Sequence, residues 1–141
     1  MQITSRFTIG IHTMLCIAHF SSTKKVTSEF LSKSTNANPV IIRRILGQLK
    51  KAKLIDVKAG VGGSYLLKDP KDITLLDIFK AVGAKEEQLF SFHSNPDCKC
   101  PIGKNIRSIL NDHLVDIENA MLNQMKKTTL SELLKETQQY L

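Results

Sequence analysis

The sequence has few cysteines and no long apolar run, which argues against a disulfide-rich secreted protein and against a membrane-spanning protein. Three cysteines in 141 residues, two of them one residue apart, do not make the disulfide framework of a small secreted protein. No stretch approaches the roughly 18 apolar residues of a membrane-spanning helix, and residues 1–4 lack the charged and hydrophobic regions of a signal peptide. We therefore expect a cytoplasmic protein that does not enter a membrane.

Catalytic motifs are missing as well. The sequence has no set of nucleophile, base and orienting residue, no phosphate-binding loop and no paired carboxylate motif. Its histidines at positions 12, 19 and 113 have no partner at catalytic spacing. We therefore expect that the protein is not an enzyme.

The positive charge is concentrated in the N-terminal part of the chain. Residues 1–83 hold 13 Lys and Arg against five Asp and Glu, a net +8, whereas residues 84–141 hold seven against eight, a net −1. Residues 43–58 alone carry six basic side chains against Asp56, a net +5. Such a field attracts a polyanion, and DNA carries one phosphate charge about every 1.7 Å of axis. A solvated lysine-rich face is the alternative interpretation.

Residues 38–69 predict a basic amphipathic helix followed by a glycine-tipped hairpin. Asn38 is a good N-cap and Pro39 suits the first helical position. Apolar residues then recur on one helix face, at Ile42, Ile45, Leu46 and Leu49. After Leu54 the period changes to two, with strands expected at residues 55–58 and 64–68 around a tip at 59–63. This pattern is typical of a winged helix.

The segment before Asn38 supplies the other helices of that fold. Thr4 or Ser5 caps a first helix that runs to the polar residues 21–25, and Thr27 starts a short helix that stops at residues 34–37. Two helices joined by a short turn form a helix-turn-helix, whose second helix enters the major groove. We therefore predict a mainly α fold with a small β-wing, in which residues 1–83 form a winged helix-turn-helix DNA-binding domain.

The remainder of the chain predicts a linker and a long helix. Thr74 and Asp77 have capping-box spacing for a helix that ends at Gly83. Residues 84–103 form a cysteine-containing linker, and residues 104–141 form a dimerisation helix and a final helix capped by Thr129. The long helix, about 36 Å, has an apolar stripe made of Ile106, Leu110, Leu114, Ile117, Met121 and Met125. A second copy of the chain is the simplest partner for this stripe, and packing on its own domain is the alternative.

The order of these motifs is similar to that of a known family. TSEFLSKS, NPVIIRRILGQLKKAKLI, GVGGSYLL and ITLLDIFKAV closely resemble the Rrf-two family of bacterial winged-helix transcription regulators, and the resemblance covers essentially the whole chain. The segment HSNPDCKCPIG resembles the subgroup of YwnA-like regulators. The resemblance implies a homodimer, commonly a repressor, whose long helices cross and whose two recognition helices and wings contact one palindromic operator in double-stranded DNA.

The chain departs from the family pattern at two places. Iron–sulfur members carry three well-separated cysteines before the long helix, whereas this segment has only Cys98 and Cys100. We therefore expect no iron–sulfur cluster, no other cofactor and no metal site. Many members have an arginine before the first wing glycine, where this chain has Ala59. Contact between the wing and DNA is then expected to be weaker or purely electrostatic.

The expected DNA contacts divide into base contacts and backbone contacts. The side of the second helix opposite its apolar stripe carries the candidates for base contact, which are Val40, Arg43, Arg44 and Gly47. Glycine inside a helix costs about 1 kcal/mol relative to alanine. Either close approach of a ligand or packing against another helix would explain why Gly47 is present. The candidates for contact with phosphates are Arg6, Asn38, Lys50, Lys51 and Lys58. Thr27 at a helix start and Gly60, Gly62 and Gly63 in the wing are further candidates for contact with DNA.

Two questions stay open from the sequence. The first is the role of Cys98 and Cys100, for which three alternatives stand: a redox-sensing pair, a pair of metal ligands, or no effector role. Cys16 is expected to be a buried core residue. The function predicted from charge and motifs is that of a dimeric sequence-specific transcription regulator. A winged-helix module that binds protein or RNA is the alternative, and Arg43 with Arg44 on the outward face disfavours a protein partner.

Overall fold

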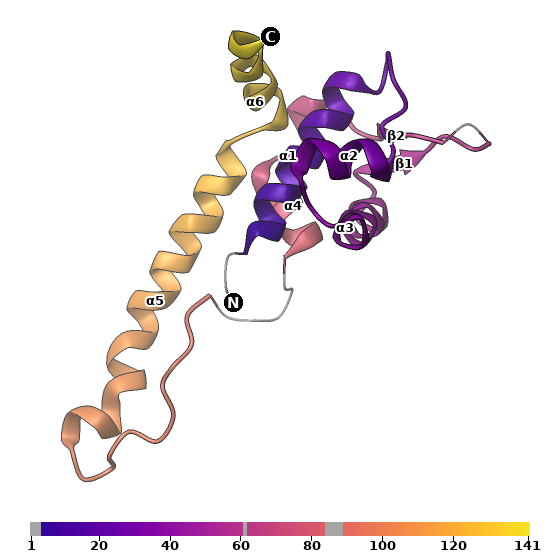
Figure 1. The fold of residues 1–141 in the computed structure, drawn as a ribbon. Coiled ribbons are helices and arrows are strands. Elements are labelled where there is room, and N and C mark those ends of the chain that lie inside the picture. Colours follow the sequence, from indigo (N-terminus) through magenta and orange to yellow (C-terminus); the bar gives the residue numbers. More distant parts are fainter. Residues whose placement is uncertain (1–3, 61, 84–88) are drawn as a thin grey trace.

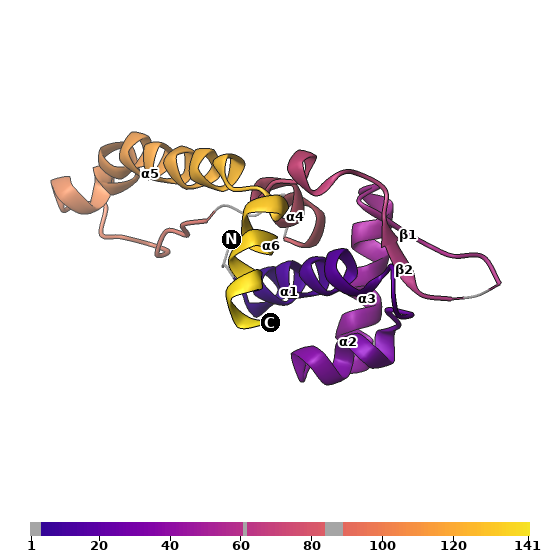
Figure 2. The same cartoon turned by 90° about the horizontal axis from the view of Figure 1, so that it is seen from above.

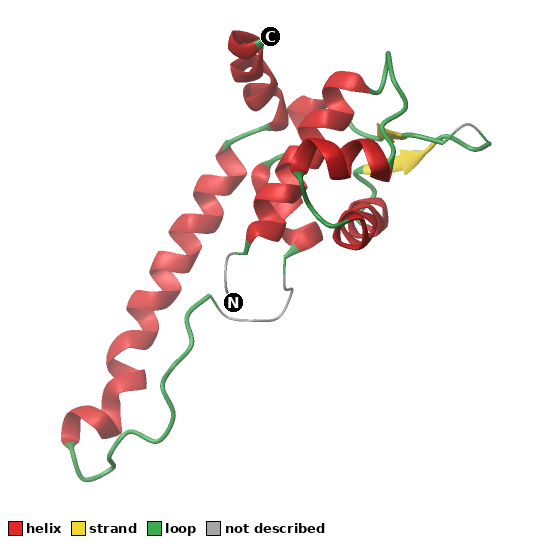
Figure 3. Cartoon of the chain, in the orientation of Figure 1, coloured by secondary structure: helices red, strands yellow, loops and turns green. Residues whose placement is uncertain are grey.

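The computed structural model describes residues 4–60, 62–83 and 89–141. Figures 1 and 3 show a helical domain with a small hairpin on one side and a long helix that projects away from it. This arrangement confirms the predicted fold class. The elements, in chain order, are α1 Ser5–Phe20, α2 Ser28–Thr35, α3 Pro39–Lys51, β1 Ile55–Val57, β2 Ser64–Leu66, a 3-10 turn Pro70–Asp72, α4 Leu75–Val82, α5 Pro101–Lys127, α6 Leu130–Thr137 and a 3-10 turn Gln138–Tyr140.

The helices begin at side chains that accept hydrogen bonds from free backbone amides. Thr4 accepts from Arg6 N, Thr27 from Phe30 N and Asn38 from Val40 N. Thr74 forms the full capping box with Asp77, and Thr129 accepts from Glu132 N. Each such cap is worth about 1 kcal/mol because it satisfies a donor that the helix leaves free. The predicted starts of these five helices are thereby confirmed, with Thr4 rather than Ser5 as the first cap.

The core lies between α1, α3, α4 and the sheet, with α2 and α6 packed against it. On α3, the predicted inward residues Ile42, Ile45 and Leu49 are fully buried, and Leu46 is half-buried. The other fully buried large side chains come from the remaining segments of the domain and from α6: Met14, Ile17, Val26, Leu31, Ile55, Ile73, Ile78, Val82 and Leu130. This core holds α3 by one face and leaves its other face to solvent.

The long helix is joined to the domain at its C-terminal end. Leu75 N donates to Thr128 O at 3.0 Å, and Leu130 N donates to Ile73 O at 2.8 Å. α6 then packs on α1, with Leu130 in the core. Seen from above in Figure 2, the rest of α5 extends beyond the domain. No residue of α5 is buried, and within the described residues no helix is both long and apolar enough to cross a membrane.

α5 begins at Pro101, so the prediction that it starts at residue 104 was wrong. Pro101 occupies the first helical position, and the Sγ atom of Cys100 accepts a hydrogen bond from Gly103 N at 3.4 Å. A Cβ at Gly103 would lie 2.8 Å from the carbonyl oxygen of Asp97, so glycine is needed here for close approach to the preceding loop. The linker predicted for residues 84–103 therefore ends at Cys100, since proline suits the first helical position. Residues 84–88, at the start of the predicted linker, and Val61, in the predicted wing tip, lie outside the described residues.

Candidate nucleic-acid interface

The outward face of α3 carries the residues expected to contact bases. Val40, Arg43, Arg44 and Gly47 are all exposed, on the side of the helix opposite the buried Ile45. Val40 has 55% of its surface exposed. An apolar side chain beside two guanidinium groups suits a groove in which thymine methyls and guanine acceptors both occur. Contact with bases stays a prediction.

A short turn sets α3 against α2. Ser32 Oγ donates to Ala37 O at 2.7 Å, and Ala37 N donates to Thr35 Oγ1 at 3.2 Å. Asn36 adopts a left-handed conformation with φ 54°, which asparagine tolerates better than most residues. These bonds fix the turn between α2 and α3, and the outward face of the N-terminal half of α3 stays exposed. The side chain of Thr27 caps the start of α2.

The candidate phosphate contacts are exposed but not equally free. Asn38 uses its Oδ1 atom to cap Val40 N at 2.8 Å, which leaves its amide nitrogen to donate outward. Lys51 and Lys58 are exposed. Lys50 lies 3.7 Å from a carboxylate oxygen of Asp56, and both side chains are about half exposed. A pair in that setting contributes little energy, so DNA can replace Asp56 as the partner of Lys50.

Arg6 has a partner within the domain that the sequence did not indicate. Its Nη2 atom donates to Gln48 Oε1 at 2.6 Å, and its side chain is half-buried. Within the described residues its buried Nε atom has no hydrogen-bond partner. Arg6 therefore joins the start of α1 to α3. Contact between Arg6 and a phosphate stays a prediction, and it would use the remaining nitrogens of the guanidinium group.

The wing hairpin is anchored at its base and open toward its tip. β1 and β2 pair antiparallel, and Lys58 N donates to Gly63 O at 3.0 Å beyond them. Gly63 has φ +86°, and a Cβ there would lie 3.2 Å from Lys25 Cα. Ser64 N also donates to Val26 O at 3.0 Å. Gly63 is thus required by packing on the segment before α2.

Other glycines of the predicted site have open surroundings. A Cβ at Gly60, Gly62 or Gly47 would have no described atom within 4 Å among those considered. For Gly47, packing against another helix is therefore not seen among the described residues, and close approach of a ligand stays a prediction. Gly60 and Gly62 have φ +73° and +76°, a conformation that glycine adopts without strain. Gly60 is exposed, whereas Gly62 is half-buried and its N–H donates to Lys58 O at 3.1 Å.

Two lysines beside the wing were missed in the sequence. Lys24 and Lys25 line a hollow of about 220 Å³ together with Lys58 and residues 62–64. They belong to the polar segment 21–25 after α1, and no local pattern places them near the wing. The sequence held one indication that these lysines belong to the candidate interface. They form a basic pair just before Thr27, in the part of the chain that carries all of the excess positive charge.

The cysteines are in two separate places. Cys98 and Cys100 are exposed free thiols, and Cys100 caps α5. Cys16 is buried in α1, as expected, with its sulfur 3.5 Å from Ser34 Oγ. Within the described ranges, no three His, Cys, Asp or Glu side chains converge as a metal site. The expectation of no cofactor and no metal stays a prediction.

A helix-turn-helix with an exposed arginine face, followed by a hairpin wing, defines the class of winged-helix DNA-binding proteins. The model of the Rrf2 family, described as iron-dependent transcriptional regulator, matches residues 3–136. YwnA of Bacillus subtilis (strain 168), which bears the name of an HTH-type transcriptional regulator, is 40% identical over 94% of this chain and 97% of its own. The chain belongs to the Rrf-two (Rrf2) family, as the sequence motifs had predicted, and is a DNA-binding transcription regulator by family.

Solved structures have the same fold. A crystal structure described as that of a DNA-binding protein superposes with a TM-score of 0.73 at 33% identity, covering 92% of this chain and 99% of the other. The structure of IscR from T. potens superposes with a TM-score of 0.72 at 17% identity, covering 97% of this chain and 88% of that one. Cys98 and Cys100 are exposed and Cys16 is buried in α1, and within the described residues no group of three His, Cys, Asp or Glu could hold a metal ion; whether this chain binds the iron of the family description stays untested.

Proposed function

We propose that the protein is a homodimeric, sequence-specific transcription regulator that represses by occupying a palindromic operator. The observation that supports this most is the exposed face of α3, where Arg43 and Arg44 flank Val40 near the helix N-terminus. Arginine can contact guanine O6 and N7 with two parallel bonds, and each such contact discriminates by about 1–3 kcal/mol. An apolar face would instead favour a protein partner, so the two arginines disfavour a module that binds protein.

The homodimer is supported by the state of α5. A helix of 27 residues, about 40 Å long, has no buried side chain. Ile102, Ile109 and Ile117 are each at least half exposed, at 65%, 50% and 52%. Exposed apolar surface of this extent marks an interaction site, and the same helix of a second copy is self-complementary to it. Two copies would present two α3 helices to half-sites about 34 Å apart.

DNA selection from a random duplex library tests this proposal directly. The full-length protein should enrich one inverted repeat, and binding to that duplex should weaken steeply with salt, by about 0.9 in the log–log slope for each phosphate contact. An Arg43→Ala, Arg44→Ala variant should enrich no motif yet retain salt-dependent binding. Enrichment of unrelated sequences by the wild-type protein, or affinity that does not change with salt, would contradict the proposal.

We further propose that the exposed thiols make operator binding sensitive to oxidation. Cys100 Sγ holds the first turn of α5 through Gly103 N, and Cys98 stands two residues before it. An added disulfide-forming reagent such as diamide would take two electrons and two protons from the thiols and change the sulfur that caps the helix. Loss of this cap would change the first turn of the long helix in both subunits. We expect that change to alter the spacing of the two α3 helices.

A further inference from the structure

The segment between α1 and α2, residues 21–27, is fixed against the wing by its backbone. Ser64 N, at the start of β2, donates to Val26 O at 3.0 Å, and Lys58 N donates to Gly63 O at 3.0 Å across the hairpin. A Cβ at Gly63 would lie 3.2 Å from Lys25 Cα, so the segment touches the hairpin at a residue without a side chain. Gly63 therefore adjoins Lys58 across the hairpin and Lys25 on the α1–α2 segment, which gives the two lysine backbones a fixed relation.

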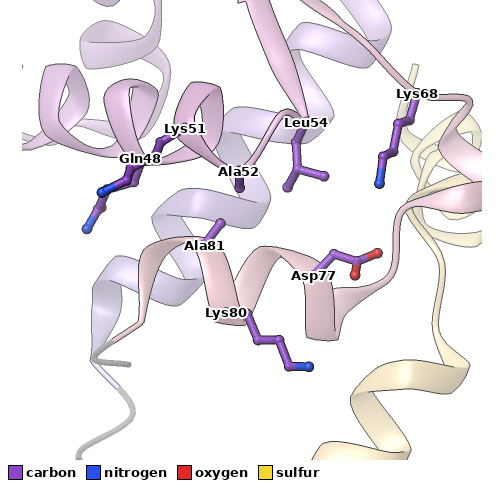
Figure 4. Close-up of a pocket in the computed structure, with 8 residues that line it drawn as sticks. All are labelled: Gln48, Lys51, Ala52, Leu54, Lys68, Asp77, Lys80 and Ala81. Atoms are coloured by element: carbon purple, nitrogen blue, oxygen red, sulfur yellow. The ribbon is translucent and has the colours of Figure 1, made fainter. Parts of the chain in front are cut away.

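Three lysines stand around this contact without an acidic neighbour. Lys24, Lys25 and Lys58, here called the wing lysines, are exposed and line a hollow of about 220 Å³. Its other lining residues are serine, threonine and glycine, so the lining has a net charge of +3 and no carboxylate. In the larger hollow between α3 and α4, by contrast, the carboxylate of Asp77 lies between two of the lysines (Figure 4). No wing lysine forms an ion pair within the part of the chain that the structure describes.

This arrangement suits a polyanion better than a small anion. Lys24 has its Nζ atom 5.1 Å from the centre of the Phe20 ring at the end of α1, whereas Lys58 belongs to the hairpin. Such a contact with an aromatic ring is weak at an exposed site and leaves the charge of the ammonium group in place. A small anion needs ammonium groups that converge on one position. On duplex DNA each lysine can instead contact a different phosphate, so convergence is not required.

The wing lysines from the α1–α2 segment lie across the hairpin from the predicted base contacts. In Figure 1 this segment is on one side of the hairpin and α3 is on the other. With α3 in the major groove, the hairpin lies over the adjoining backbone, and the segment reaches phosphates outside the bases that α3 contacts. Lys58 is the one basic residue of the hairpin, residues 55–66. Most of the positive charge at the wing therefore comes from Lys24 and Lys25.

We propose that Lys24 and Lys25 bind phosphates of the DNA that flanks each half-site, on the side of the wing away from α3. This rests on the proposed operator binding and adds to it a contact that does not depend on sequence, because phosphate contacts fix position and orientation without reading bases. The DNA that each subunit binds is then longer than the segment that α3 reads.

Two duplexes of different length test this with the full-length protein. The short duplex carries only the selected inverted repeat, and the long duplex extends it by about one helical turn at each end. Lys24→Gln with Lys25→Gln should weaken binding to the long duplex by at least about tenfold, since exposed charge pairs are worth up to about fivefold each. Its salt slope should fall by about 3.6, for two lysines in each of two subunits at about 0.9 each. On the short duplex the variant and the wild type should bind alike.

Two further variants serve as controls. Lys24→Arg with Lys25→Arg keeps the charge and should keep the wild-type affinity and slope on the long duplex. Lys126→Gln with Lys127→Gln removes an adjacent exposed pair at the end of α5, on the side of the domain away from the hairpin, and should change neither.

The possible results separate this proposal from operator binding itself. Equal affinity and slope of the Lys24→Gln, Lys25→Gln variant and the wild type on the long duplex would overturn the flanking contact while operator binding stands. An equal loss on both duplexes would also overturn it, because the lysines would then act within the half-site. Failure of the wild-type protein to select any inverted repeat would instead contradict the proposed function.

Discussion

Replacing Ile117 by glutamate should separate the dimer into monomers. Ile117 lies in the middle of α5 with 52% of its surface exposed. Burying a whole isoleucine side chain contributes about 1.5–3 kcal/mol, so burying the exposed half contributes about 1 kcal/mol in each subunit. Glutamate would lose this and also place a charge in an apolar interface, which costs several kcal/mol per ion. The dimer dissociation constant should rise by at least about a thousandfold, the equivalent of about 4 kcal/mol.

Sedimentation velocity at micromolar concentration is the assay, and Asn119→Glu is the matched control. Residue 119 follows Ile117 by two positions, or about 200° around the helix, and it is exposed. Both variants should keep the wild-type melting temperature of the DNA-binding domain, because α5 contributes no buried residue to it. Ile117→Glu alone should sediment as a monomer and bind operator poorly. A monomeric wild-type protein, or equal dissociation of both variants, would refute the reasoning.

The remaining predictions concern the DNA interface, the wing and the thiols. Arg44→Ala should cost about 1–3 kcal/mol on the selected duplex and relax base selectivity, whereas Lys58→Ala should weaken all duplexes alike; fluorescence anisotropy measures both. Gly63→Ala should lower the free energy of unfolding by at least about 1–2 kcal/mol in urea titrations, because φ is +86° and the new Cβ meets Lys25. Diamide should weaken operator binding, and Cys98→Ser with Cys100→Ser should abolish that response.

Each of these predictions has a control in the same chain. Gly60 has a similar φ of +73° but no described atom near its absent Cβ, so Gly60→Ala should lose only the energy of backbone strain and less than Gly63→Ala. Equal, sequence-independent losses for Arg44→Ala and Lys58→Ala would show that Arg44 only positions the protein. Identical operator affinity before and after oxidation would leave both exposed cysteines without a sensory role.

Local chemistry explains which elements the sequence could predict. Helix starts depend on a side chain and an amide two or three residues apart, so Thr27, Asn38 and Thr74 were identified from sequence alone. The face of α3 that packs inward followed from the 3.6-residue period. The start of α5 was missed because cysteine is an uncommon helix cap. In addition, glycine is needed at position 103 because the folded loop brings Asp97 O close to it, a contact that the sequence does not show.

Contacts between distant segments could not be predicted. The bond between Arg6 and Gln48 joins residues 42 positions apart, and no local pattern selects that pair. Lys25 lies beside Gly63 because Val26 pairs with Ser64, a bond set by how α1 and α2 place the intervening segment. The hollow between α3 and α4 combines three lysines that are 29 residues apart at most. Their charge was visible in the sequence only as part of a general basic excess.

The attachment of α5 determines how a change in the dimer would reach DNA. Its last residues are held by two backbone bonds to residues 73 and 75, and Leu130 continues into the core. Its first turn is capped by the Sγ atom of Cys100 through Gly103 N, and Lys104 N donates to Cys100 O at 2.9 Å. Since no residue of α5 is buried, a change at Cys100 would disturb this turn and leave the buried core intact. On the proposed dimer, a chemical event at Cys100 would thus alter the placement of two intact α3 helices relative to each other, and a palindrome is read only when that spacing is correct.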